Sequence, residues 1–183
     1  MRVIAGEFRS RLLKSVSGAE VRPTPDRLRE TLFNILAPEI PGCVFLDAYA
    51  GSGSVGIEAL SRGAERTVFI EKSKEAADVI EENLRALGLK NRATVLRGAV
   101  QKEMDSGLAD VVFLDPPYPL EGEYRPVLEM LGGNTRIRIV VAQHSVRMEL
   151  AEHYRALKRY RQVRQGENVL SFYRLDSQLL QQP

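Results

Sequence analysis

The chain has 183 residues, of which 44% are apolar and 27% charged, and its formal net charge is +2. This length and composition are typical of one globular domain that buries its core without disulfides or metal. A single cysteine, Cys43, excludes an internal disulfide. No apolar run approaches the roughly 20 residues of a membrane span or forms a signal peptide, so we expect a cytoplasmic protein.

Positive charge is concentrated near the two ends of the chain. Basic side chains outnumber acidic ones within residues 1–30 and again within 155–174. This distribution indicates an anionic partner such as nucleic acid, and a solvated charged surface is the alternative. The first 14 residues alternate and turn around GEFRS, which predicts a hairpin. We therefore expect a single domain over residues 1–183, with 1–22 as a basic N-terminal hairpin extension.

The segment RPTPDRLRETLFNIL is predicted to start a helix near residue 24. Thr24 is the expected N-cap, Pro25 suits the first helical position, and Asp26 suits the positive end of the helix dipole. The apolar stripe that would face the core comprises Leu28, Leu32, Ile35 and Leu36.

From residue 44 onward, short apolar strands alternate with helices. The pattern predicts strands at 44–47, 66–71, 93–98, 110–115, 137–143, 157–164 and 168–175, and helices at 54–63, 74–88 and 122–131, with Ser73 as an N-cap. Strands that are apolar throughout indicate a parallel sheet covered on both faces. The predicted fold is α/β and Rossmann-like: a mostly parallel seven-stranded sheet with helices on both faces and a closing antiparallel hairpin.

Polar or glycine residues follow four of these strands: Asp47, Glu71, Gly98 and Asp115. In an open parallel sheet, ligands bind beyond the carboxyl ends of the strands. The sequence therefore predicts a binding site at this edge.

The stretch LDAYAGSGSVGIEAL contains Gly51, Gly53 and Gly56 in a G-x-G-x-x-G arrangement, and Glu71 follows 20 residues after Gly51. This spacing is typical of a loop that binds a nucleotide cofactor. Asp47 would repel the pyrophosphate of a dinucleotide, but it can hold the ammonium group of S-adenosylmethionine. Glu71 can accept hydrogen bonds from ribose hydroxyls. The arrangement favours S-adenosylmethionine over NAD.

Both acids also have a plainer interpretation. Asp47 would cap nearby backbone amides, and Glu71 would pair with Lys72 or Lys74. The glycines would then form a tight strand-to-helix turn without a ligand.

The stretch VVFLDPPYP ends a buried strand with an acid and two prolines. Neither proline can donate a ladder hydrogen bond, and both fix φ, so the segment after Asp115 is stiff and extended. We expect the Asp115 carboxylate and the Pro116 carbonyl to accept the two N–H groups of an exocyclic amine, with Tyr118 as a flat surface for base stacking. These hydrogen bonds would stabilise the charge that develops on the amine as it is methylated. The alternative is a rigid loop.

Several stretches together resemble the bacterial 16S ribosomal RNA guanine-N2 methyltransferases: LDAYAGSGSVGIEALSRGA, VFLDPPY, RVIAGEFRSR, RPTPDRLRE and LSFYRL. The resemblance covers nearly the whole chain. It implies a class I methyltransferase that uses S-adenosylmethionine to methylate the N2 amine of one guanine in 16S ribosomal RNA, on the 30S particle. We expect a monomer without a metal.

The motifs and the resemblance give three predicted sets of residues. The catalytic set is Asp115, Pro116, Pro117 and Tyr118, and the RNA-binding set is Arg9, Arg11 and Arg22. The cofactor-binding set is Asp47, Ala48, Gly51, Ser52, Gly53, Glu71, Lys72, Gly98, Ala99 and Asp115. Ala99 departs from the family pattern, because many such enzymes carry an acid there that holds the adenine amine.

Three other functions stay open at the level of sequence. A DNA adenine-N6 methyltransferase would share the glycine loop and D-P-P-Y, but no sequence-reading domain is evident, and Asp115 stands where adenine enzymes often have Asn. An NAD(P)-binding oxidoreductase would share only the glycine loop, and the chain has no identifiable hydride-transfer acid or base. A non-catalytic RNA-binding protein would need neither the acids nor D-P-P-Y.

Overall fold

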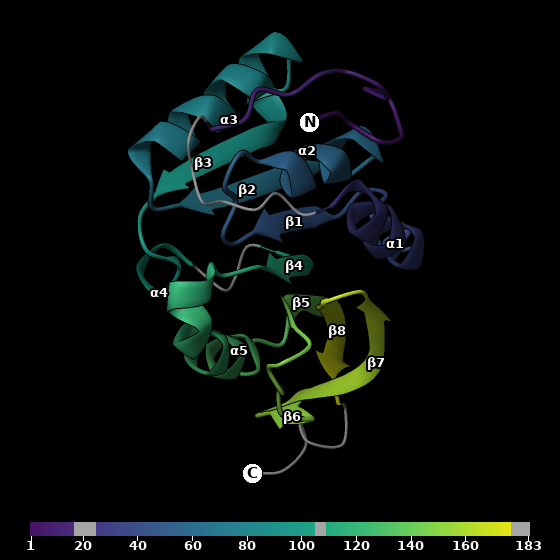
Figure 1. Ribbon diagram of the computed structural model, residues 1–183, viewed down its shortest axis with the longest axis vertical. Helices are drawn as coiled ribbons and strands as arrows, with labels where there is room; N and C mark the ends of the chain where they lie inside the picture. Colours follow the sequence, from purple (N-terminus) through teal and green to yellow (C-terminus); the bar gives the residue numbers. More distant parts are fainter. Residues whose placement is uncertain (17–24, 105–108, 177–183) are drawn as a thin grey trace.

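The computed structural model describes residues 1–16, 25–104 and 109–176, which contain an eight-stranded sheet flanked by helices (Figure 1). The strand order is β3-β2-β1-β4-β5-β8-β7-β6. The strands are β1 (Val44–Asp47), β2 (Arg66–Glu71), β3 (Ala93–Arg97), β4 (Val111–Leu114), β5 (Ile139–Ser145), β6 (His153–Tyr154), β7 (Leu157–Gln165) and β8 (Asn168–Leu175). The helices are α1 (Asp26–Leu36), α2 (Ser54–Ser61), α3 (Lys74–Ala86), α4 (Val100–Glu103) and α5 (Tyr124–Leu131), with the 3-10 helices η1 (Lys90–Arg92) and η2 (Tyr118–Glu123).

The strands β3, β2, β1, β4 and β5 run parallel, and β8, β7 and β6 continue the sheet in antiparallel pairs. The predicted α/β class, parallel sheet and closing hairpin are confirmed. The predicted number of seven strands is wrong, because the two residues of β6 pair with Leu157 and Lys158 of β7. A strand of two residues is too short to show a period in the sequence.

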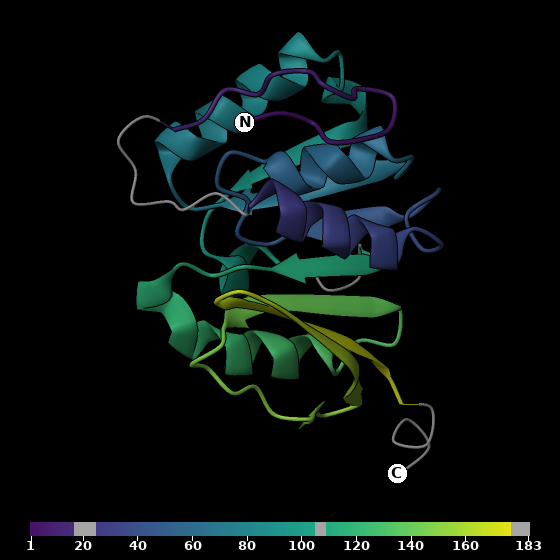
Figure 2. The ribbon, with the colours of Figure 1, turned by 45° about the vertical axis from the view of Figure 1, so that its right-hand side comes forward.

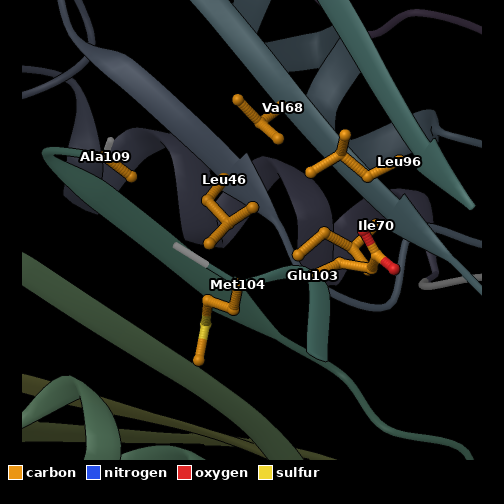
Figure 3. A pocket seen from close by; sticks show the side chains of 7 residues that line it. All are labelled: Leu46, Val68, Ile70, Leu96, Glu103, Met104 and Ala109. Carbon is orange, nitrogen blue, oxygen red and sulfur yellow. The ribbon is translucent and has the colours of Figure 1, made fainter. Parts of the chain in front are cut away.

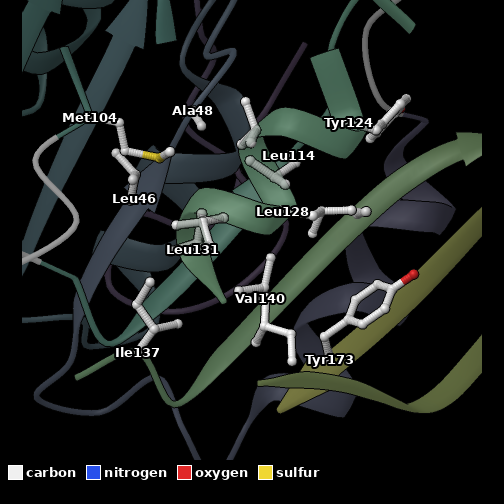
Figure 4. Packing of buried hydrophobic residues seen from close by; sticks show 14 of the residues in the cluster. Leu46, Ala48, Met104, Leu114, Tyr124, Leu128, Leu131, Ile137, Val140 and Tyr173 are labelled. Carbon is white, nitrogen blue, oxygen red and sulfur yellow. The ribbon is translucent and has the colours of Figure 1, made fainter. Parts of the chain in front are cut away.

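Successive residues of β4 point to opposite faces of the sheet, and both faces are buried. Val112 and Leu114 pack in an apolar cluster with α4 and α5 (Figure 4). Val111 and Phe113 pack on the other face with α1 and α2. Burial on both sides is the reason that the strand is apolar at every position.

The ends of two helices test the expected caps. Ser73 caps α3 as predicted, since its hydroxyl accepts a hydrogen bond from the Ala76 N–H at 3.3 Å. The α1 helix begins at Asp26 with Pro25 as its N-cap, so the placement of Pro25 at the first helical position is wrong by one residue. Thr24 lies outside the described residues.

Residues 1–13 fold back as a hairpin, which lies across α2 and α3 (Figures 1 and 2), and residues 17–22 of the predicted extension lie outside the described residues. Its two arms are joined by the Val3 N–H, which donates to the Arg11 carbonyl at 3.0 Å. The buried carboxylate of Glu58 on α2 accepts hydrogen bonds from the Ile4 N–H at 2.8 Å and the Ala5 N–H at 3.0 Å. The hairpin is thus fixed to the body by main-chain bonds to a buried acid.

The tip of the hairpin approaches the C-terminal end of α2 very closely. Gly6 has φ +83°, and a Cβ at this position would come within 1.9 Å of the Ser61 carbonyl oxygen. The Phe8 N–H donates to the Ser61 hydroxyl at 3.0 Å. Only glycine combines this backbone conformation with this approach.

Candidate active site

The carboxyl ends of β1, β2 and β4 bring three acids to one edge of the sheet. The pairing registers place Asp47 beside Phe69 of β2 and Phe113 of β4, and Asp115 directly follows β4. Glu71 ends β2 and is paired with Arg97 of β3. The predicted convergence of these strand ends therefore exists, and Gly98 joins it at the end of β3.

The three glycines of the loop after β1 have different structural roles. Gly51 and Gly53 have φ of +54° and +79°, which favour glycine, and Gly53 is the N-cap of α2. At Gly56 the constraint is packing, because a Cβ there would come within 2.2 Å of Cε1 of Phe69. The loop is therefore a tight turn that also lets α2 lie directly on β2.

Asp47 is almost fully buried at the base of this loop. Its Oδ2 accepts a hydrogen bond from the Gly56 N–H at 2.8 Å. One oxygen of Asp47 therefore caps a helix amide, as the plainer interpretation of this acid expects. Burial raises the pKa of the Asp47 carboxyl to about 7; the Gly56 hydrogen bond opposes this, and the charges of Asp115 and Glu71 add to it. The edge of the sheet is thus a site of concentrated negative charge.

Glu71 holds the two turns that surround the loop. Its Oε2 accepts from the Gly51 N–H at 2.7 Å, and its Oε1 accepts from the Ser73 N–H at 2.7 Å. In the described part of the chain these backbone bonds replace the alternative pairing with Lys72 or Lys74. Each carboxylate oxygen has two acceptor positions, so Glu71 retains the capacity to accept hydroxyl donors.

The D-P-P-Y segment leaves the sheet as an extended strand end. Asp115 is half-buried, Pro116 is buried, and Pro117 has φ −61° and ψ 152°. The Pro117 carbonyl accepts from the Leu120 N–H at 2.7 Å, which starts η2 at Tyr118. The position of the Tyr118 side chain lies outside the described part of the structure.

Two further contacts at this edge were not predicted from the sequence. The Tyr49 hydroxyl donates to Oε2 of Glu123 at 2.5 Å, which ties the glycine loop to the end of η2. Burial, with the Glu123 carboxylate, raises the pKa of the Tyr49 hydroxyl. Tyr49 lies within the glycine-loop stretch, but Glu123 belongs to no motif, so only the adjacency of β1 and β4 could have identified the pair.

An apolar pocket lies under the edge, between the sheet and α4 (Figure 3). Its lining residues are Leu46, Val68, Ile70, Leu96, Glu103, Met104 and Ala109. The carboxylate of Glu103 lies against the backbone of Gly98, since a Cβ at Gly98 would come within 2.4 Å of its Oε1. An acid is therefore present beside Gly98 and Ala99, four residues later in the chain than the family pattern places it.

The other predicted residues are distributed as follows. Ala48 is buried and donates its N–H to the Phe113 carbonyl at 3.0 Å, Ser52 is half-buried in the glycine loop, and Lys72 is exposed after β2. Ala99 is the N-cap of α4.

Of the predicted RNA-binding arginines, Arg9 lies away from this edge. Arg9 and Arg11 are exposed on the hairpin. Arg9 lies near the tip, which packs on the C-terminal end of α2, whereas the glycine loop precedes the N-terminal end of that helix. An eight-residue helix is ~12 Å long, which separates Arg9 from the loop. Arg22 lies outside the described residues.

The described residues, 1–16, 25–104 and 109–176, contain neither a membrane-spanning helix nor a cluster of metal ligands. No helix there is long and apolar enough to cross a membrane. No group of three or more His, Cys, Asp or Glu side chains there has the arrangement of a metal site.

The strand order, the glycine loop and the acids at the ends of neighbouring strands define a Rossmann-like methyltransferase. The solved structure described as "Putative methyltransferase yhhF from Escherichia coli" superposes with a TM-score of 0.83 at 28% identity, covering 97% of this chain and 98% of that one. A Thermus structure, described as hypothetical protein TTHA0928, has a TM-score of 0.78 at 31% identity, covering 94% of this chain and 98% of that one. The predicted methyltransferase fold is confirmed.

The chain belongs to the family described as "Conserved hypothetical protein 95", whose model matches residues 1–174. It is 36% identical over 161 residues to "Putative rRNA methyltransferase YlbH" of Bacillus subtilis, which covers 83% of this chain and 86% of the relative. It is 42% identical over 123 residues to "Ribosomal RNA small subunit methyltransferase D" of Haemophilus influenzae, which covers 64% of each chain. The resemblance to small-subunit ribosomal RNA methyltransferases is confirmed.

Proposed function

We propose that the protein transfers a methyl group from S-adenosylmethionine to the exocyclic N2 amine of a guanine in 16S ribosomal RNA. The observation that carries this proposal is the convergence of Asp47, Glu71 and Asp115 at one edge, next to the rigid D-P-P-Y segment. The names of the relatives support ribosomal RNA as the substrate. The choice of guanine N2 rests on the sequence resemblance.

The charges at the site fit S-adenosylmethionine better than a dinucleotide. Asp47 is desolvated and faces the negative fields of Asp115 and Glu71. A pyrophosphate would add charge of the same sign, whereas a cofactor with an ammonium and a sulfonium group would relieve the repulsion. Asp47 and Glu71 would hold the cofactor together with the backbone of Gly51 and Gly53. When bound, this cofactor supplies an electrophilic methyl group.

The D-P-P-Y segment would hold the target base. The Asp115 carboxylate and the Pro116 carbonyl would accept the two N–H bonds of the amine, and Tyr118 would stack on the base. When the amine displaces S-adenosylhomocysteine from the methyl group, Asp115 would stabilise the positive charge that develops on the nitrogen. The surplus proton then leaves to Asp115 or water. The products are N2-methylguanine and S-adenosylhomocysteine.

The basic N-terminal hairpin would provide electrostatic contacts to the RNA. Arg9 and Arg11 are exposed on it and are available to phosphates, and Arg22 follows in the same basic stretch. Because the tip of the hairpin and the acidic edge lie at different places on the surface, the RNA would have to span both. This geometry favours a large folded substrate such as the 30S subunit, which a cytoplasmic monomer would bind.

The proposal is tested by transfer of labelled methyl from S-adenosylmethionine. The substrates are 30S subunits lacking the modification, protein-free 16S ribosomal RNA, and duplex DNA, with identification of the labelled nucleoside. N2-methylguanosine from ribosomal RNA is the expected product. Label in DNA adenine would refute ribosomal RNA as the substrate but would agree with amine methylation at the D-P-P-Y segment. Label in another nucleoside of ribosomal RNA would refute guanine N2 as the methylated position.

A further inference from the structure

Asn83, on α3, connects the N-terminal segment to the glycine loop. Its side chain is buried, with 3% of the residue exposed. Its Oδ1 accepts from the Lys14 N–H at 2.8 Å, and its Nδ2 donates both to the Lys14 carbonyl at 3.0 Å and to the Ser52 carbonyl at 3.3 Å. One buried amide therefore contacts two chain segments that are 38 residues apart, at positions 14 and 52.

The orientation of this amide is fixed by chemistry. The Lys14 N–H can only donate, so the side-chain atom that faces it must be the oxygen. The nitrogen then uses both of its hydrogens on carbonyl groups. Asn is thus a suitable residue here, because no other side chain of this size offers one acceptor and two donors. An apolar substitution would leave these main-chain groups of Lys14 and Ser52 without the Asn83 partner.

A second contact on Lys14 does not reach the loop. The Lys14 ammonium pairs with Oε2 of Glu82 at 2.7 Å, and both side chains are exposed. This ion pair holds the N-terminal segment to α3 and makes no contact with Ser52. It provides a natural control, because it shares the same helix and the same partner residue.

We propose that Asn83 is a positioning residue that couples cofactor binding in the glycine loop to the position of the basic N-terminal segment. A cofactor that orders the loop fixes the Ser52 carbonyl and so strengthens its hydrogen bond to Asn83. The same amide then holds Lys14 and the arm that carries Arg11. If the cofactor raises the affinity for a partner that orders the arm, then by thermodynamic linkage that partner raises the affinity for the cofactor by an equal factor. The predicted effect of the cofactor on the N-terminal segment rests on the contacts within the fold. The predicted effect on RNA binding rests on the proposed function.

The first test measures amide hydrogen exchange at Lys14 with and without S-adenosylhomocysteine, in the full-length protein. The cofactor product is expected to slow exchange at Lys14 about fivefold or more in the wild type, the lower end of typical allosteric coupling. Asn83→Asp retains an acceptor for the Lys14 N–H but loses both donors, so this slowing should disappear. Glu82→Gln should retain it. Melting temperatures confirm that each variant is folded.

The second test measures binding to 30S subunits lacking the modification, with and without S-adenosylhomocysteine. The cofactor product should raise the affinity for the 30S subunit in the wild type and in Glu82→Gln, and this increase should be absent in Asn83→Asp. A purely structural Asn83 would weaken both affinities without changing their ratio. An unchanged Lys14 exchange rate in the liganded wild type would overturn the inference without the use of any variant. Because the exchange experiment contains no RNA, its result is independent of whether the proposed substrate is correct.

Discussion

Replacing Asp47 by Asn should change how the stability of the protein depends on pH. The pKa of Asp47 is raised from 3.8 to about 7 in the folded chain, mainly because its carboxyl is desolvated. Between about pH 4 and pH 7 the folded state therefore holds a proton that the unfolded state has released. The free energy of unfolding must then fall as pH rises through this window, and the loss is complete above the folded pKa.

The size of the effect follows from the shift. About three pH units at 1.36 kcal/mol each give at most about 4 kcal/mol, which is a large part of the stability of a typical domain. Asn in place of Asp47 stays neutral and keeps an oxygen for the Gly56 N–H. The variant should therefore match the wild type near pH 4 and exceed it near pH 8, in the absence of cofactor.

The assay is urea unfolding at intervals from pH 4 to pH 8 for both proteins. Glu152→Gln, at an exposed position directly before β6, controls for the loss of one carboxylate from the net charge. If the unfolding free energies of wild type and Asp47→Asn run parallel over the whole range, the desolvation argument is refuted. The same variant should bind S-adenosylhomocysteine more weakly, since the proposed site would lose the charge that holds the ammonium group.

Three further substitutions follow from the contacts. Asp115→Ala should abolish methyl transfer while calorimetry still shows S-adenosylhomocysteine binding; full activity would refute its role at the amine. Gly56→Ala should lower the unfolding free energy by about 1–3 kcal/mol, because its Cβ meets the Phe69 ring, and a smaller residue at 69 should restore part of it. Gly6→Ala clashes with the Ser61 carbonyl and should release the hairpin, seen as faster proteolysis near the N-terminus.

The alternation of strands and helices could be predicted because the spacing of apolar residues along short stretches of the chain indicates each element. The central strands β1 and β4 are apolar at nearly every position, and polar residues mark their ends. The edge where Asp47, Glu71 and Asp115 meet follows from that alternation alone, because the carboxyl ends of parallel strands share one edge. The glycine positions also follow, since left-handed φ at Gly51 and Gly53 is a local requirement.

Other features depend on contacts between distant segments, which no local pattern encodes. The sequence predicts a hairpin, but the position where it packs on α2 depends on Glu58 and Ser61, which are more than 50 positions away in the chain. The two-residue β6 exists only because β7 is beside it.

The sequence by itself determined the fold class, the glycine loop and the acids of the site. The tertiary structure decided their physical state: the raised pKa of Asp47 comes from burial and from neighbouring carboxylates on other strands. It also decided that Asn83, an ordinary helix residue in the sequence, contacts both Lys14 and Ser52. Desolvation and long-range hydrogen bonds are properties of the packed chain, and they arise only when its distant parts are in contact.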